Sequence, residues 1–187
     1  SAGNDIRYMP EKLDQASNFA NKLWNASKFA LGNIKEDIDV SFMESENVPE
    51  NLAYEDKWIL SKLNNIIKEI TTNLDNYDMG VALQKIYDFV WNEFCDWYIE
   101  MVKPRLYDEN CINKNACLWT LNKVLINSLK LLHPVMPFIS EEIFMKLYHN
   151  EESIMISKWP EYKNEYNFEI EEKQIEELKE VIVGIRN

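Results

Sequence analysis

The stretch LWTLNKVLINSLKLL, residues 118–132, places leucine at positions 118, 121, 125, 129 and 132. Steps of three and four residues put these five side chains on one face of an α-helix. His133-Pro134 and Pro137 follow directly and are expected to end that helix, because proline cannot continue its hydrogen-bonded ladder. An apolar helix face of this length indicates a bundle, in which neighbouring helices cover it.

The same periodicity recurs on both sides of this stretch. Asp78 is expected to cap the third helix and Ser140 a shorter helix after Pro137. The short apolar run at 154–156 is predicted to form a small strand or an extended edge. Further helices are expected over about residues 11–31, 54–74, 78–103 and 168–185. The predicted fold class is all-α, a helix bundle with short connections and a short C-terminal extension.

The inner faces of these helices predict the core. Trp24, Trp58, Phe89, Trp97 and Leu125 are expected to be largely buried where the main helices meet. The core stripe of the first helix is expected to comprise Leu13, Ala16, Ala20, Leu23, Trp24, Ser27 and Leu31. That of the third helix is expected to comprise Leu83, Ile86, Phe89, Val90, Phe94, Trp97 and Met101.

Composition excludes several classes of protein. The 187 residues carry 32 acidic and 20 basic side chains, a net charge of −12, whereas nonspecific nucleic-acid binders usually show a basic footprint. No apolar run approaches the roughly 20 residues of a membrane span, and no secretory signal is recognisable. Three cysteines without a CxxC pair favour a reducing, cytoplasmic compartment.

No motif of a common enzyme class is present. GxxxxGK[ST], GxGxxG, HExxH and GxSxG are all missing. His133, beside a proline at a helix end, suits a capping or surface role, and Cys111 and Cys117 do not match zinc spacing. We therefore expect neither a catalytic residue nor a metal site in this chain.

One face of the first helix shows a different pattern. Glu11, Gln15, Asn18, Lys22, Asn25 and Phe29 lie within about 80° of one another around the helix axis, nearly opposite the expected core stripe. Amide side chains suit the reading of base edges, lysine donates to a base or a phosphate, and an exposed aromatic ring can stack on an unpaired base. The alternative is an ordinary solvated face on which Phe29 packs near Ile34.

Several motifs in this order resemble the anticodon-binding domain of valyl-tRNA synthetases. NFANKLWNASKF (18–29) is similar to the helix that opens that domain, and LLHPVMPFISEE (131–142) to its proline-bounded turn. DKWILSKL (56–63), VWNEFCDWY (90–98), KPRL (103–106) and Trp159-Pro160 match the segments between and after them. The third-helix motif favours the valyl over the isoleucyl enzymes, which share the bundle plan and remain an alternative. An acidic helical module that binds protein partners is the other alternative.

The resemblance implies a function for the strip. In that family the residues matching Lys22 and Phe29 lie against the anticodon, so Lys22, Phe29, Asn18, Asn25 and Gln15 are the predicted tRNA-binding residues. Some members carry arginine where this chain has Glu11. Arginine is also common at the position of Lys28; lysine keeps the charge there but cannot make the paired hydrogen bonds of a guanidinium group.

The resemblance also implies a place within a larger enzyme. It predicts anticodon recognition as part of a valine–tRNA ligase, which charges tRNA-Val with valine at the expense of ATP. The HIGH-type and KMSKS-type motifs are missing, so this chain alone is expected to be a non-catalytic fragment without a cofactor, whereas the full-length parent uses ATP with Mg. Residues 1–160 are predicted to form the anticodon-binding domain, and 161–187 a helical segment leading toward a coiled-coil arm. The expected partner is tRNA-Val, without DNA or membrane, for a monomer in the cytoplasm.

Overall fold

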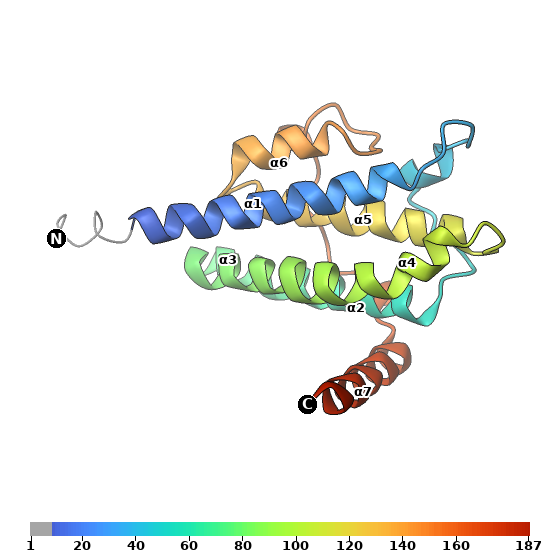
Figure 1. The fold of residues 1–187 in the computed structure, drawn as a ribbon. Coiled ribbons are helices and arrows are strands. Elements are labelled where there is room, and N and C mark those ends of the chain that lie inside the picture. Colours follow the sequence, from blue (N-terminus) through green and yellow to red (C-terminus); the bar gives the residue numbers. More distant parts are fainter. Residues whose placement is uncertain (1–8) are drawn as a thin grey trace.

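The computed structural model describes the backbone of residues 9–187 and the side chains of residues 14–187. Regular structure within this range is helical, with no strand. The long helices α1 (Met9–Gly32), α2 (Tyr54–Asp75) and α5 (Lys114–Leu132) run along one another (Figure 1). The other elements are η2 (Ser41–Glu44), α3 (Met79–Asp88), η3 (Phe89–Ile99), α4 (Glu100–Tyr107), α6 (Pro137–Phe144), η4 (Ile154–Ile156), η5 (Asn164–Tyr166) and α7 (Glu169–Arg186). The predicted all-α class is confirmed.

Helix α5 lies in the centre of the bundle. The leucines at positions 118, 121, 125, 129 and 132 are at most 1% exposed, which confirms the predicted face. The middle of α5 is also tied to two connecting segments. The buried Asn122 side chain donates to the carbonyls of Met43 and Tyr148, at 3.2 and 2.8 Å, and so attaches η2 and the segment after α6 to this central helix.

Several predicted helix ends agree with the structure and others do not. Asp78 caps α3 by accepting from the Val81 amide at 3.5 Å, as expected. The predicted third helix corresponds to α3, η3 and α4, which follow one another without a break. It does not stop at Pro104 but continues to Tyr107, where the Pro104 carbonyl still accepts from the Asp108 amide at 3.2 Å. Ser140 is not a cap: Pro137 opens α6, since a first-turn proline needs no amide hydrogen, and Ser140 is buried one turn later. Residues 154–156 form a 3-10 turn rather than a strand.

Buried residues of the third helix recur at steps of four residues from Ala82 to Leu106. A four-residue step drifts by about 40° per turn in an ordinary α-helix, so the buried side would wind around the axis. The π-helical segment η3 opposes this drift, because its wider i→i+5 turns hold more residues. The buried residues that follow the four-residue step are Ala82, Ile86, Val90, Phe94, Tyr98, Val102 and Leu106, and Phe89, Cys95 and Ile99 are buried beside them.

The different register explains the errors in the predicted core. Leu83 is exposed, and Trp97 and Met101 are only half-buried, because the buried side advances by four residues per turn. Of the five residues expected to be largely buried, Trp58, Phe89 and Leu125 are confirmed, whereas Trp24 and Trp97 are half-buried.

A buried polar network joins α2, η3, α4 and the start of α5. Asp56, which is fully buried, accepts from the Ala53 amide and from both terminal nitrogens of Arg105, at 2.8 and 2.9 Å. The Tyr98 hydroxyl donates to the same carboxylate at 2.7 Å. Burial first, and then the Asp56 charge, raise the pKa of Tyr98 well above its ordinary value, so the phenol stays a donor. Arg105 also binds Glu55 and Asn113. The network connects residues of three of the quoted motifs, so these motif residues link neighbouring helices of the bundle.

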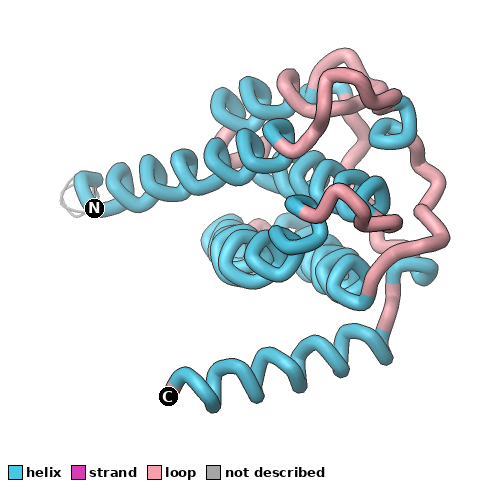
Figure 2. The backbone as a smooth tube through the Cα atoms, turned by 45° about the vertical axis from the view of Figure 1, so that its right-hand side comes forward, coloured by secondary structure: helices cyan, strands magenta, loops and turns pink. Residues whose placement is uncertain are grey.

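Helix α7 packs on α2, and Figure 2 shows it along the outer side of the bundle. Trp58 donates its indole hydrogen to Glu176 at 2.9 Å, and Lys179 binds Glu93 of η3 at 2.7 Å. The opposite face of α7 exposes apolar residues, among them Ile170, Val181 and Ile185. No helix in the described range is long and apolar enough to cross a membrane.

Candidate nucleic-acid interface

Helix α1 turns a different face to the core than its sequence predicts. Phe19, Leu23, Ala26 and Ala30 are its main buried residues, and their centre lies about 80° around the axis from the expected stripe. Ala16 of that stripe is exposed, Ala20, Trp24 and Leu31 are half-buried, and the side chain of Leu13 is outside the described residues. Only Leu23 and Ser27 are buried as predicted.

This rotation moves the predicted strip from the outward face to the edge of the core. Gln15, Asn18 and Asn25 are exposed, as expected. Lys22 and Phe29 are half-buried at the contact with the third helix, so the expectation that the whole strip faces away from the core is wrong. The side chain of Glu11 lies outside the described residues.

Lys22 is held on two sides by residues of η3. Its ammonium group donates to the Asp96 carboxylate at 2.8 Å and lies 4.4 Å from the centre of the Trp91 ring. The Lys22 side chain keeps 28% of its surface exposed and that of Asp96 keeps 48%, so the pair is open to a ligand. Two fixed contacts give the ammonium group a defined position and leave its remaining hydrogens available.

Three aromatic rings, stacked as a column, lie beside the Lys22 ammonium group and end at Trp91. Phe19 stacks on Tyr87 with 5.0 Å between ring centres, and Tyr87 stacks on Trp91 at 5.4 Å. Phe19 is buried, whereas Tyr87 and Trp91 are half-buried, so the column leads from the core to the surface. Sequence analysis missed Tyr87 and Trp91, although their four-residue spacing places them beside the buried Ile86 and Val90.

Phe29 lies about two turns after Lys22 on the same side of α1, near α4. The Lys103 ammonium group is 5.9 Å from the Phe29 ring centre and donates to Glu100 at 2.6 Å. That hydrogen bond raises the pKa of Lys103. We call Gln15, Asn18, Lys22, Asn25 and Phe29, together with Trp91 and Asp96, the α1–η3 surface. It combines amides, one positioned ammonium group and half-exposed aromatic rings.

The other flank of α1 carries a second cationic and aromatic group. Trp24 lies between Lys28 and Lys146, whose ammonium groups are 5.5 and 4.0 Å from its ring. Among residues 14–187 neither lysine forms an ion pair with a carboxylate. Sequence analysis assigned Trp24 to the core, and for that reason this group was missed.

The described residues offer little for covalent or metal chemistry. They hold no group of three or more His, Cys, Asp or Glu side chains that could bind a metal ion. Burial raises the pKa of Cys95 and of Cys117 to about 12, so both thiols are protonated near neutral pH and are poor nucleophiles. The His133 ring and the Ser140 hydroxyl form a hydrogen bond of 3.1 Å at the start of α6, which suits a structural role.

Comparison with known proteins adds an independent finding. Residues 56–187 match the family model described as the anticodon-binding domain of tRNA ligase. The chain is 48% identical over 185 residues to a valine–tRNA ligase of Clostridium tetani, and 45% identical over 185 residues to one of Thermotoga maritima. These alignments cover 99% of this chain and 21% and 20% of the two relatives, so the chain spans about a fifth of their length. Helix α1 precedes the family match but lies within both alignments.

Proposed function

The chain belongs to the family of anticodon-binding domains of tRNA ligases, and from this premise we propose that its α1–η3 surface binds the anticodon loop of a tRNA. Protein contacts with single-stranded RNA loops combine ring stacking with hydrogen bonds to base edges. Gln15, Asn18 and Asn25 supply exposed amides, and Trp91 and Phe29 supply rings. The observation that carries the proposal is the Lys22 ammonium group, fixed between Asp96 and Trp91 at the open edge of an aromatic column.

The position of Lys22 suggests that it contacts a base. A lysine that only neutralises phosphate needs no defined direction, because the attraction between charges is not directional. Asp96 accepts a hydrogen bond from the ammonium group and thereby orients its other N–H groups. Asp96 also places a negative charge beside Lys22, which disfavours a phosphate at this point. We therefore propose that Lys22 donates to a base edge and that Asp96 orients it.

We further propose that the domain acts within a valine–tRNA ligase and that tRNA-Val is its partner. The names of the relatives support valine rather than isoleucine. ATP, with Mg, would bind elsewhere in such an enzyme, which would work as a monomer in the cytoplasm. Residues 1–160 would form the anticodon-binding bundle, and residues 161–187, tied to it by Trp58 and Lys179, would lead toward the remainder of the ligase.

Binding of the 187-residue chain to tRNA-Val and to the same tRNA with a changed anticodon tests this account. Lys22→Met keeps most of the side chain and removes the charge and the donors. We expect it to weaken binding of the cognate tRNA by about tenfold, the loss of one charge-assisted hydrogen bond, and to weaken the other much less. Lys173→Met, which removes a charge from an exposed position of α7, outside this surface, is the matched control and should change neither affinity.

Asp96→Asn distinguishes the two roles of Lys22. If Asp96 orients Lys22 toward a base, this variant lowers the preference for the cognate anticodon while total affinity stays the same or rises, because one repulsive charge is lost. Equal weakening of both tRNAs by Lys22→Met, with a shallower dependence of affinity on salt, would instead assign Lys22 to a phosphate.

A further inference from the structure

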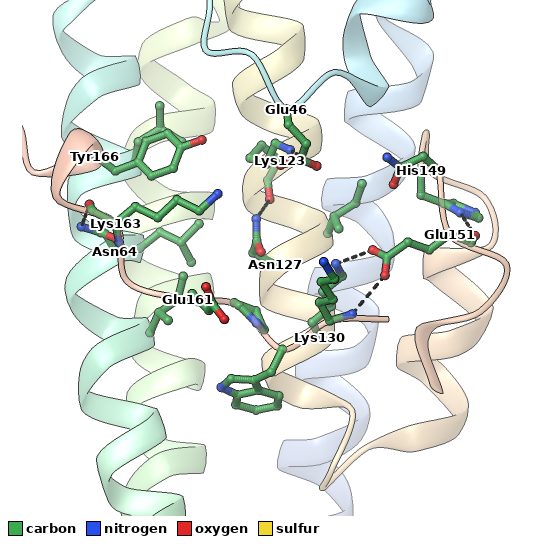
Figure 3. Close-up of a pocket in the computed structure, with 18 of the residues that line it drawn as sticks. Glu46, Asn64, Lys123, Asn127, Lys130, His149, Glu151, Glu161, Lys163 and Tyr166 are labelled. Atoms are coloured by element: carbon green, nitrogen blue, oxygen red, sulfur yellow. Dashed lines mark hydrogen bonds and ion pairs between the residues drawn. The ribbon is translucent and has the colours of Figure 1, made fainter. Parts of the chain in front are cut away.

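A cavity of about 560 Å³ lies between α2, α5 and the segment 158–166, and none of the described side chains of α1 lines it. Apolar α2 residues are part of its lining: Leu60, Leu63 and Ile67. Figure 3 shows the polar side chains that surround the cavity. Its rim carries Lys123 and Lys130 from α5 and Lys163 from the C-terminal segment. The volume falls within the roughly 300–1,000 Å³ typical of small-ligand sites.

The walls of the cavity are fixed by hydrogen bonds. The Asn64 side chain, which is almost fully buried, pairs with the backbone of Lys163 through two hydrogen bonds of 2.9 Å. The Trp159 indole donates to the Thr71 hydroxyl at 3.0 Å. The Glu151 carboxylate accepts from Lys130 at 2.6 Å and from the Lys158 amide at 3.0 Å. The segment that closes the cavity is therefore held in place before any ligand binds.

Carboxylates line the cavity as well as lysines, and they pair with two of the three lysines: Glu151 with Lys130 and Glu46 with Lys123. Figure 3 shows Lys163 extending across the cavity in the direction of Lys123. Burial is the largest cause that lowers the pKa of Lys123; Lys130 and Lys163 lower it further, whereas Glu46 opposes them. Glu46 binds Lys123 at 3.2 Å but is itself mostly exposed. Among the described residues Lys163 has no carboxylate partner, and its ammonium group lies 5.8 Å from the Tyr166 ring centre. An anion between Lys163 and Lys123 would relieve their repulsion.

We propose that this cavity binds a nucleoside monophosphate unit, with its phosphate on Lys163 and Lys123 and its base on the apolar α2 residues of the lining. Trp159 and Tyr166 supply aromatic edges for the base. Asn127, which lines the cavity, donates one amide hydrogen to the Lys123 carbonyl and retains an oxygen that can accept from a base edge. The chemistry is the same for a free nucleotide and for an unstacked nucleotide of an RNA. The proposal does not depend on the α1–η3 surface.

Titration of the 187-residue chain with adenosine 5′-monophosphate tests the proposal, with adenosine and inorganic phosphate as separate probes. We expect the nucleotide to bind more tightly than either part and to shift the Trp159 indole N–H signal. Lys163→Met should weaken nucleotide binding by about tenfold, the loss of one charge-assisted contact, and leave adenosine binding unchanged. Lys173→Met is the matched control. Nucleotide binding no tighter than adenosine binding, or equal affinities of Lys163→Met and the wild-type chain, would overturn the proposal.

Repeating the titration with tRNA present identifies the source of the nucleotide. If saturating tRNA-Val displaces adenosine 5′-monophosphate, the cavity holds a nucleotide of the tRNA. If the nucleotide binds equally well with tRNA present, the ligand is a free nucleotide. Because the titration without tRNA comes first, failure of anticodon binding would not affect its outcome.

Discussion

Lys22 and Phe29 lie seven residues apart on the same side of α1, yet their surroundings differ. Lys22 is held by a carboxylate and a ring of η3, whereas Phe29 is half-buried beside Lys103. Helical spacing predicted correctly that both residues lie on one side of α1. It could not predict how deeply they are buried, because burial depends on where the neighbouring helix lies.

Substitution of Phe29 tests whether an aromatic ring of α1 stacks on a base of the tRNA. A base stacked on an aromatic ring is stabilised by about 1–3 kcal/mol, so Phe29→Ala should weaken tRNA binding by at least about fivefold. Phe29→Tyr, which retains the ring, should bind like the wild-type chain. Urea unfolding of both variants separates loss of binding from loss of structure. Normal tRNA binding by folded Phe29→Ala would remove Phe29 from the interface.

The individual elements differ in how far their sequence predicts them. The leucine repeat of α5 sufficed to predict its buried face, because the helix is regular and packed on many sides. The third helix deviates, since its four-residue repeat from Ala82 to Leu106 requires the π segment η3. That repeat was visible in the sequence. An assumption of 3.6 residues per turn instead assigned Leu83, Trp97 and Met101 to the core. On α1 small alanines occur on several sides, so apolar spacing alone left its rotation undetermined.

The rotation of α1 can be measured through stability. Phe19→Ala should destabilise the chain by about 3–5 kcal/mol, because Phe19 is buried and supports Tyr87. Ala16→Ser, at an exposed position that the sequence assigned to the core, should change stability by less than about 0.5 kcal/mol. Urea-induced unfolding followed by circular dichroism gives both values. Similar effects of the two substitutions would contradict the observed orientation.

The buried network around Asp56 links four parts of the molecule: α2, η3, α4 and the start of α5. Arg105→Lys retains the charge but loses the two-pronged contact with the Asp56 carboxylate, which stays buried. We expect destabilisation by about 2–3 kcal/mol. Lys103→Met, which breaks the exposed pair with Glu100, is the control and should change stability by less than about 1 kcal/mol. Equal denaturation midpoints for the two variants would show that the network contributes little.

The proposed place of the chain within a ligase predicts its behaviour in isolation. We expect the 187-residue chain to bind tRNA without catalysing valine-dependent exchange of pyrophosphate into ATP, because its sequence contains neither a HIGH-type nor a KMSKS-type motif for binding ATP. The assay uses labelled pyrophosphate, valine and ATP, with a full-length valine–tRNA ligase as the positive control. Exchange above background by the purified chain would refute the non-catalytic assignment.

The six tryptophans of the chain allow the location of the bound RNA to be measured. An anticodon stem-loop of tRNA-Val is added to the isotope-labelled chain while the indole N–H signals are followed by NMR. We expect a saturable shift of the Trp91 signal, which becomes smaller when the anticodon is changed. The Trp58 signal should change little, because its indole is bound to Glu176 in the α2–α7 contact. An unshifted Trp91 signal, with binding detected at other tryptophans, would contradict the proposed location of the RNA.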